Sequence, residues 1–229
     1  MKRSLGTFLV AILSGCTILE PNKWPSGSRE IVLTFDDGPS PKVSNELLDV
    51  LKKHKVKATF CLIGKNIENE PDVAKRIVAE GHDIAMHTFD HTTATLLSGN
   101  RLTRENNAWT ELVQREGIID SDDVFLFRPP CGIITPSVLQ ARREGKFQFA
   151  YLTFFVNDAA TEGDTAASVM LKIKERLVKH DGGAIVLHEM RYRYGSNNSL
   201  IDKSWLPGAV DDLIIWAEEN GFRFSKYKP

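Results

Sequence analysis

The chain has 229 residues and a mass of 25.7 kDa, which suits one large domain or, less readily, two small ones. Its hydrophobic content of 42% supports a sizeable core, and its formal net charge of −1 gives no general reason to expect a nucleic-acid partner. The sequence shows no internal repeat or low-complexity tract, which argues against solenoids and repeat arrays.

The N-terminus has the pattern of an export signal. Lys2 and Arg3 precede an apolar run over 5–13 that is too short to span a bilayer comfortably. Residues 13–16, Leu-Ser-Gly-Cys, then resemble the lipobox of bacterial lipoproteins, which implies cleavage before Cys16 and a lipid on its sulfur. The alternative is a plain secretory signal with an incidental cysteine. Both readings predict export, and the first predicts a membrane-anchored protein that faces the periplasm or the cell wall.

These features predict three parts: a lipoprotein signal peptide over 1–15, a lipidated Cys16 with a short tether over 16–28, and a folded domain over 29–229. A tether of roughly 15 residues reaches at most about 50 Å when it is extended, so an anchored domain would work close to the membrane. With Cys16 carrying lipid, only Cys61 and Cys131 remain, and two cysteines do not make a disulfide framework.

The rest of the chain alternates strand-like and helix-like segments. Apolar runs predict strands over 31–35, 57–62, 83–86, 124–127, 149–156, 184–187 and 222–225. Helical spacing of apolar residues and capping signals predict helices over 41–51, 71–80, 104–116, 136–144, 166–177 and 208–220. Repeated strand-then-helix order implies parallel strands with helices outside, so we expect an α/β barrel or a doubly wound sheet.

The candidates for chemistry each follow the carboxyl end of a predicted strand. In chain order they are Asp36 and Asp37, His87 and His91, Arg128, Asn157 and Asp158, and His188. Parallel α/β barrels build their active sites at that end of the strands. An ordinary solvated turn is the alternative for Asp36 and Asp37, but scattered turn residues would not be expected to choose one end of the sheet five times.

Gly38 and Pro39 stop the first strand, so the two adjacent carboxylates can bend into one pocket. Two carboxylates held close together must either share a proton, or one must bind a metal while the other stays free to act as a base. His87 and His91 stand four apart, on one face if the segment is helical.

Thr88 stands where the zinc metalloprotease motif requires a glutamate, so the histidine pair is not that motif. Two histidines and one carboxylate suit zinc hydrolases and non-haem iron oxygenases alike. A spare carboxylate, His188 as an acid and Arg128 as a fixed positive charge describe hydrolysis better than oxygen chemistry.

Four motifs together resemble the polysaccharide deacetylases of carbohydrate esterase family 4, the NodB-homology domain. They are TFDDGP at 34–39, HTFDH at 87–91, RPPCG at 128–132 and VLH at 186–188, and the likeness extends over roughly 29–225. The resemblance implies a distorted (β/α)7 barrel with parallel strands and the active site at their C-terminal ends. It also implies hydrolysis of an acetyl group on a sugar polymer and one divalent metal ion, commonly zinc, with Co2+ or Ni2+ as alternatives.

By motif position the resemblance implies a role for each residue. The metal ligands would be Asp37, His87 and His91, and Asp36 would be the general base with Arg128 behind it. His188 would protonate the departing amine, and the backbone N–H of Cys131 would bind the acetyl oxygen as it becomes negative.

Three positions depart from the family pattern. Cys131 replaces a usual Tyr, and Val186 replaces the Leu that commonly lines the pocket for the acetate methyl group. The Asp-x-x-Asp-Trp motif that supports the acid histidine is degraded: Asn157 falls on the key position and Asp158 lies one residue away. If Asn157 were the partner, His188 would lose the charge that raises its pKa, and activity would be weaker.

A loop over 189–206 carries Tyr192 and Tyr194 directly after His188, which predicts a sugar-binding lip, with an ordinary solvated loop as the alternative. The sequence therefore predicts an exported metal-dependent N-deacetylase that acts on an envelope glycan, with peptidoglycan favoured. A catalytically weak glycan-binding lipoprotein and a barrel deacylase for a small amide are the alternatives, and an iron oxygenase is the least favoured. The oligomeric state is not predicted.

Overall fold

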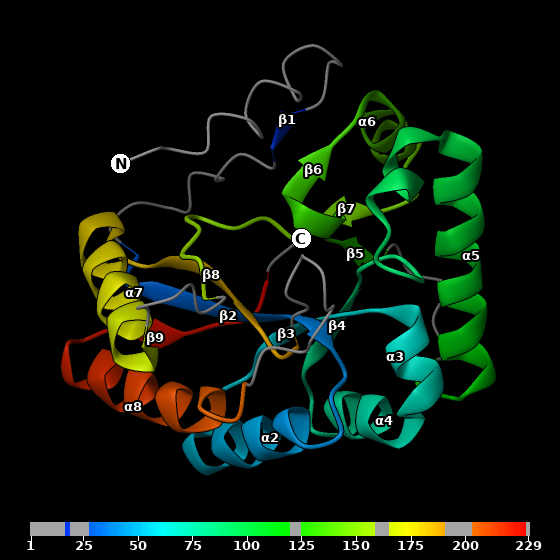
Figure 1. The fold of residues 1–229 in the computed structure, drawn as a ribbon. Coiled ribbons are helices and arrows are strands. Elements are labelled where there is room, and N and C mark those ends of the chain that lie inside the picture. The colour runs from blue at the N-terminus through cyan, green and yellow to red at the C-terminus, as the bar shows by residue number, and fades with distance from the viewer. Residues whose placement is uncertain (1–16, 19–27, 120–124, 159–164, 191–202, 228–229) are drawn as a thin grey trace.

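The computed structural model describes residues 17–18, 28–119, 125–158, 165–190 and 203–227 (Figure 1). The predicted signal peptide, Cys16 and most of the tether lie outside the described residues, as do Tyr192 and Tyr194. Among the helices in the described ranges, none is long and apolar enough to cross a membrane.

Seven strands of the described chain form one sheet, and every pair in it is parallel. The order across the sheet is β7 (Gln148–Phe149), β5 (Leu126–Phe127), β4 (Asp83–Met86), β3 (Thr59–Leu62), β2 (Glu30–Gly38) and β8 (Gly183–His188), and β9 (Arg223–Phe224) pairs with the start of β2. Phe154, downstream of β7, bridges in parallel to Ile185 of β8 and joins the two edges. The predicted fold class is confirmed: the chain is an α/β fold that closes into a distorted barrel.

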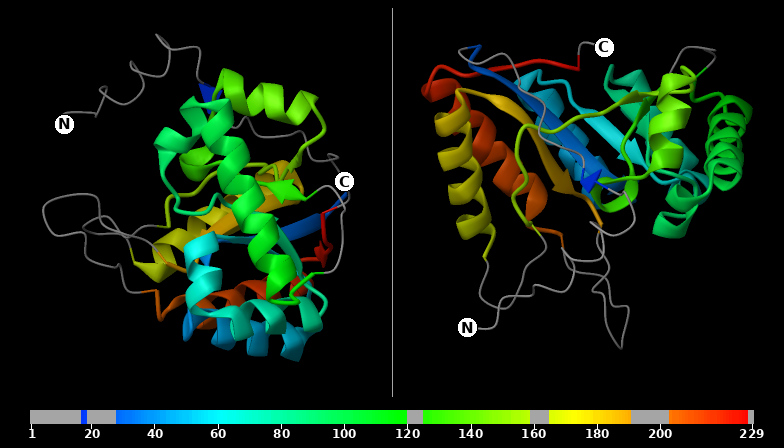
Figure 2. Two further views of the ribbon diagram at one scale, coloured as in Figure 1. Left: turned by 90° about the vertical axis from the view of Figure 1, so that its right-hand side faces the viewer. Right: turned by 90° about the horizontal axis from the view of Figure 1, so that it is seen from above.

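Helices surround this ring of strands (Figures 1 and 2). They are α2 (Val43–His54), α3 (Gly64–Asn69), α4 (Pro71–Ala79), α5 (Gly99–Arg115), α6 (Pro136–Arg143), α7 (Ala166–His180) and α8 (Leu206–Glu219), with short 3-10 turns η1 (Thr93–Leu97) and η2 (Pro130–Gly132). Outside the ring, β1 (Thr17–Ile18) pairs antiparallel with β6 (Ile133–Ile134).

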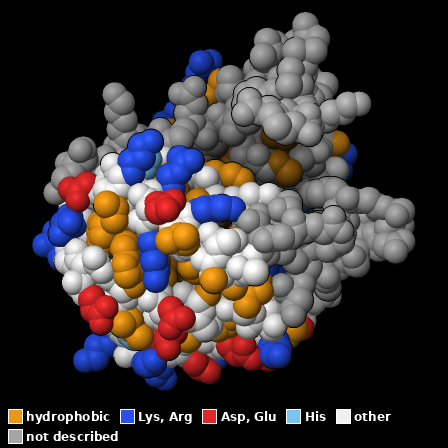
Figure 3. Space-filling model, turned by 60° about the vertical axis from the view of Figure 1, so that its left-hand side comes forward, with side chains coloured by type: hydrophobic (Ala, Val, Ile, Leu, Met, Phe, Trp, Pro, Cys, Tyr) orange, Lys and Arg blue, Asp and Glu red, His pale blue; other side chains and the backbone are white. Residues whose placement is uncertain are grey.

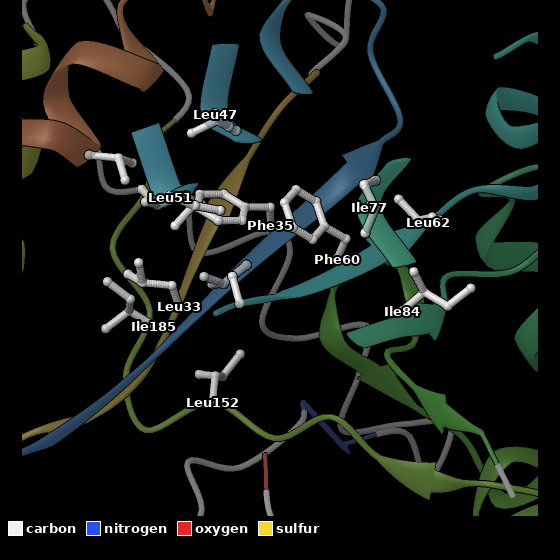
Figure 4. Close-up of a cluster of buried hydrophobic side chains, with 14 of the residues drawn as sticks. Leu33, Phe35, Leu47, Leu51, Phe60, Leu62, Ile77, Ile84, Leu152 and Ile185 are labelled. Carbon is white, nitrogen blue, oxygen red and sulfur yellow. The ribbon is translucent and has the colours of Figure 1, made fainter. Parts of the chain in front are cut away.

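Side chains alternate across β2, as they must in a strand. Ile31, Leu33 and Phe35 pack outward in the main core, against apolar faces of the helices such as that of Leu47 and Leu51 on α2 (Figure 4). Thr34 and Asp36 occupy the other face, which lines the inside of the barrel. A second, smaller cluster lies there and consists of Cys61, Ala85 and Ala150, with Leu126 and Tyr227 packed against it.

The long strand predicted over 149–156 is wrong as a single element. Only Gln148 and Phe149 pair with β5, and Phe154 makes an isolated bridge. The carbonyls of Ala150 and Tyr151 accept hydrogen bonds from the guanidinium of Arg128 instead of from a neighbouring strand. A buried side chain therefore interrupts the ladder where sequence periodicity predicts it to continue.

Helices α3 and η1 were not predicted, and α5 begins at Gly99 rather than near 104 because Ser98 caps it by accepting from the backbone N–H of Arg101. On the face drawn in Figure 3, the coloured side chains mix basic, acidic and apolar types. That face has no strong bias of one charge, in keeping with the net charge of −1.

Candidate active site

The end of β2 brings two adjacent carboxylates to the same mouth of the barrel. Asp36 points inward by strand alternation, whereas Asp37 would point outward in a continuing strand. Asp37 instead takes a left-handed backbone conformation with φ of 71°, and the pairing of β2 with β3 shifts register between Asp36 and Gly38. This local kink turns the second carboxylate toward the site, as the sequence predicts from the Gly-Pro stop.

His87 follows β4 directly and lies beside Asp37, with Nε2 of the imidazole 3.3 Å from Oδ1 of the carboxylate. Nε2 of His91 lies 3.3 Å from the same oxygen. The two histidines would share one face if the segment between them were helical. It is not helical, because Thr88 and His91 have φ of 62° and 57°. The N-terminus of α3 fixes this loop instead, since the N–H groups of Gly64 and Lys65 donate to the carbonyls of residues 88 and 89.

The set formed by Asp37, His87 and His91 fits a divalent cation. One ligand atom from each residue lies within 4.8 Å of the others. The Nδ1 of His87 donates to the carbonyl of Arg128 at 2.6 Å, so Nε2 of a neutral imidazole presents a lone pair to the carboxylate oxygen. Two facing lone pairs are unfavourable unless a cation lies between them.

Charge at Asp37 supports the same fit. Burial alone would raise its pKa, but the neighbouring imidazoles, of which His87 has the largest influence, outweigh burial and lower the pKa to about 2. The carboxylate is therefore ionised at neutral pH. Two imidazole nitrogens and one carboxylate oxygen are ligands that zinc accepts, with room left for water or substrate.

Arg128 holds the other carboxylate of the pair. Its Nη1 donates to Oδ1 of Asp36 at 2.6 Å and to Oγ1 of Thr34 at 2.7 Å. Nε and Nη2 donate to the carbonyls of Ala150 and Tyr151 at 3.1 and 3.2 Å. The Arg128 side chain is only 2% exposed. Burial lowers the pKa of its guanidinium, but the charge of Asp36 outweighs burial and raises that pKa. Asp36 is therefore fixed in position by a permanent positive charge.

Across the mouth, His188 ends β8 and pairs with Asp158. Nδ1 of the imidazole donates to Oδ1 of Asp158 at 2.7 Å, and the backbone N–H of His188 donates to Oδ2 at 2.8 Å. The carboxylate beside His188 is thus Asp158, one residue past the position of Asn157 that spacing favours. Burial lowers the pKa of His188, but the charge of Asp158 outweighs burial and raises it.

Lys203 completes this pair, and nothing in the sequence pattern indicated it. Its Nζ donates to Oδ2 of Asp158 at 2.9 Å and to the carbonyl of the same residue at 2.6 Å. Burial raises the pKa of Asp158, yet His188 and Lys203 together lower it well below its usual range. The partner of His188 therefore remains an anion in the folded protein.

Two of the predicted substrate-binding residues, Cys131 and Val186, lie near the catalytic candidates in the sequence of the strands and loops that carry them. Cys131 is exposed in η2, three residues after Arg128, with φ of 56°. Val186 is buried on β8 and pairs in register with Thr34, two residues before His188 and on the same face of the strand. Tyr192 and Tyr194 lie outside the described residues, so the predicted sugar-binding lip stays a prediction.

Glu189 directly follows His188 and is a buried carboxyl that no motif of the sequence indicated. Its backbone N–H donates to the carbonyl of Asp36 at 3.0 Å, and the hydroxyl of Ser44 donates to its Oε2. Its carboxyl packs so closely against Gly38 that a Cβ there would overlap Oε1. Burial is the largest influence and raises the pKa of Glu189 to about 8. A neutral acid thus packs beneath the turn that carries Asp36 and Asp37.

Comparisons with known proteins agree on one family. The family model described as polysaccharide deacetylase matches residues 23–150. A peptidoglycan-N-acetylglucosamine deacetylase of Bacillus cereus is 29% identical over 210 residues, which cover 87% of both chains. A chitooligosaccharide deacetylase of a Bradyrhizobium species is 32% identical over 212 residues, which cover 86% of this chain and 88% of that protein.

Solved structures show the same fold. PdaA of Bacillus subtilis, described as a family 4 carbohydrate esterase, superposes with a TM-score of 0.69 at 25% sequence identity. The superposition covers 96% of this chain and 86% of that one.

Proposed function

Because the chain belongs to the polysaccharide deacetylase family, whose members are metal-dependent carbohydrate deacetylases, we propose that it removes acetyl groups from N-acetylated amino sugars of the bacterial envelope, with peptidoglycan as its substrate. The observation that carries this proposal is that one mouth of the barrel holds separate groups suited to act as a base, as an acid and as metal ligands. Arg128 fixes Asp36, and His188 pairs with Asp158. The triad that fits a metal consists of Asp37 at the end of β2 and of His87 and His91 after β4.

In this proposal Asp37, His87 and His91 hold one divalent ion, with zinc favoured and Co2+ or Ni2+ as alternatives. Such an ion supplies Lewis acidity, which lowers the pKa of water and polarises the acetyl carbonyl. The chain's own residues then handle the protons. Oδ1 of Asp36 accepts from Arg128, so Oδ2 is the oxygen proposed to take the proton of the attacking water.

The second proton transfer completes the reaction. The water oxygen bonds to the acetyl carbon, the carbon–nitrogen bond breaks, and the nitrogen leaves as an amine only if it gains a proton. Nε2 of His188 is the donor in this proposal. Asp158 fixes the imidazole through Nδ1 and raises its pKa, so the proton is available near neutral pH. The backbone N–H of Cys131 is the proposed donor to the acetyl oxygen, and Val186 is proposed to line the methyl pocket.

The proposal of peptidoglycan rests on the Bacillus cereus relative and on the export signal. We propose that residues 1–15 are a signal peptide, that Cys16 carries a lipid, and that residues 29–229 form the catalytic domain at the outer face of a membrane. Tyr192 and Tyr194 are proposed to contact the glycan. The relative from Bradyrhizobium favours a second candidate, a soluble chitooligosaccharide.

A substrate panel tests this proposal. Protein loaded with zinc is incubated with purified peptidoglycan, chitooligosaccharides and acetylated xylan, and both free acetate and free glucosamine are measured. We expect acetate and new glucosamine from peptidoglycan. Faster release from chitooligosaccharides would select the second candidate. Polymer binding that is unaffected by Asp36→Asn, with no acetate from any substrate, would instead identify a glycan-binding protein.

A further inference from the structure

The interior of the barrel is lined by small side chains just below the active site. Cys61 of β3, Ala85 of β4 and Ala150 after β7 are all 0% exposed and form a cluster separate from the main core. Small residues at three neighbouring positions would leave a void along the barrel axis if nothing filled it, and voids are destabilising. The ring of Tyr227, from the segment after β9, packs against this cluster.

The path of the C-terminal segment explains how Tyr227 reaches the interior. β9 pairs with Glu30 and Ile31 at the start of β2, and Ser225 continues the pairing by donating to the carbonyl of Ile31 at 3.0 Å. Nζ of Lys226 then pairs with Asp83 at the start of β4, at 2.6 Å. The segment thus crosses the N-terminal mouth of the barrel from β2 to β4 (the red segment near the centre of Figure 1).

The phenol oxygen of Tyr227 is buried. It lies close enough to the Arg128 guanidinium for that group to lower the phenol pKa against the effect of burial. A guanidinium carries five N–H donors. Four of the hydrogen bonds from Arg128 have acceptors already described, in Ala150, Thr34, Asp36 and Tyr151. Tyr227 therefore lies beside the same side chain that fixes Asp36, and it comes from the segment that crosses the N-terminal mouth of the barrel.

We propose that Tyr227 is a positioning residue that closes the N-terminal mouth of the barrel and holds Arg128 in the orientation that fixes Asp36. The consequence for catalysis rests on the proposed function. The closure of the barrel rests on packing alone. Burial raises the pKa of Tyr227, although the charge of Arg128 opposes that shift. The phenol consequently stays neutral and places no second anion beside Arg128 to compete with Asp36.

Tyr227→Phe is the main test, because it keeps the ring in the barrel and removes only the phenol oxygen. We expect kcat for acetate release to fall about 3- to 10-fold, as for the loss of one buried polar contact, with KM unchanged. In an Arg128→Lys background the same change should have less than about twofold effect, because the two residues act as a unit. Ser225→Ala, which removes a hydroxyl from the same segment outside the barrel, should keep the wild-type kcat.

A measurement independent of activity tests the closure. In the full chain with Cys16→Ser and Cys131→Ser, a thiol reagent reports on Cys61, which the closed barrel protects. Tyr227→Ala should raise the labelling rate at least 10-fold, whereas Ser225→Ala should not. Circular dichroism confirms that each variant is folded, and Tyr227→Leu, which also removes the ring, serves if the alanine variant is not.

The outcomes separate this inference from the proposed function. Absence of acetate release by the wild-type protein would overturn the proposed function, and the labelling of Cys61 would still decide whether Tyr227 closes the barrel. An active wild type with an unchanged kcat in Tyr227→Phe, or an equal loss in the Arg128→Lys background, would overturn the positioning role. Equal labelling of Cys61 with and without the Tyr227 ring would overturn the closure.

Discussion

At the residue scale, the proposed acid step depends on a single carboxylate. The imidazole of His188 is oriented by Asp158, which also raises the pKa of that imidazole. Asp158→Asn removes the charge and keeps the shape, so we expect kcat to fall by about 100-fold. In the proposed mechanism the protonated form of His188 is the active one, so activity should fall as pH rises through its pKa. Lowering that pKa should therefore move the alkaline limb of the kcat profile to lower pH.

The neighbouring amide is the matched control for this prediction. Asn157→Ala, one residue before Asp158, should keep the alkaline limb at its wild-type position. If Asp158→Asn leaves both kcat and the alkaline limb unchanged while Asn157→Ala shifts them, then Asn157 supports the acid and our assignment is wrong.

Glu189 gives a prediction about stability in the metal-free protein. Its pKa rises from 4.5 to about 8 on folding, because burial disfavours its charge. Between these values the folded state holds a proton that the unfolded state has released. The free energy of unfolding should therefore fall as pH rises through this window, by up to about 1.4 kcal/mol per unit.

Glu189→Gln mimics the neutral acid and should flatten this dependence, so that its stability relative to wild type increases from pH 4.5 and is greatest above pH 8. Glu68→Gln, at an exposed position of α3, is the control and should keep the wild-type slope. Urea denaturation at several pH values provides the measurement. Parallel curves for wild type and Glu189→Gln would show that Glu189 is ionised in the folded chain.

At the element scale, helix caps predict a contrast between two threonines. Thr135 accepts from the N–H of Val138 at the start of α6 and also donates to the carbonyl of Leu96, and it is 1% exposed. Thr165 caps α7 at an exposed position. Thr135→Ala should cost about 2 kcal/mol or more, because a buried carbonyl also loses its donor, whereas Thr165→Ala should cost about 1 kcal/mol. Equal losses in denaturant titrations would contradict this account.

Most of the elements could be predicted from the sequence, and the exceptions have local causes. The predicted strand over 83–86 and the predicted helix near 71–80 match the structure closely. Apolar periodicity marks both elements, and a proline and a glycine mark the two ends of the helix. The prediction of one long strand over 149–156 is wrong because Arg128, which is distant in sequence, donates hydrogen bonds to the backbone carbonyls of Ala150 and Tyr151. Helix α3 was missed because six residues are too few to show a helical period.

The candidate site follows the same rule. Asp36, Asp37, His87 and His188 could be placed together because each follows a strand and short motifs contain them. Lys203 and Tyr227 could not, since each reaches its partner from a distant segment through tertiary packing alone.

At the scale of the whole molecule, the triad of Asp37, His87 and His91 predicts that a divalent ion stabilises the fold. It joins the end of β2 to the loop after β4, so an ion bound only to the folded state should raise Tm in proportion to ln(1 + [metal]/Kd). We expect zinc to raise Tm of the chelated protein and Asp37→Ala to abolish that rise. Glu68→Gln should respond as wild type does. An equal rise in Asp37→Ala would place the ion elsewhere.

The central claim is that this barrel is a deacetylase whose base is Asp36. The most direct test is the time course of acetate release from N-acetylated peptidoglycan by wild-type protein and by Asp36→Asn, after elemental analysis shows one zinc ion in each. We predict steady release by the wild type and a loss of about 100-fold or more in the variant. No release by zinc-loaded wild type, or equal release by Asp36→Asn, would contradict the account.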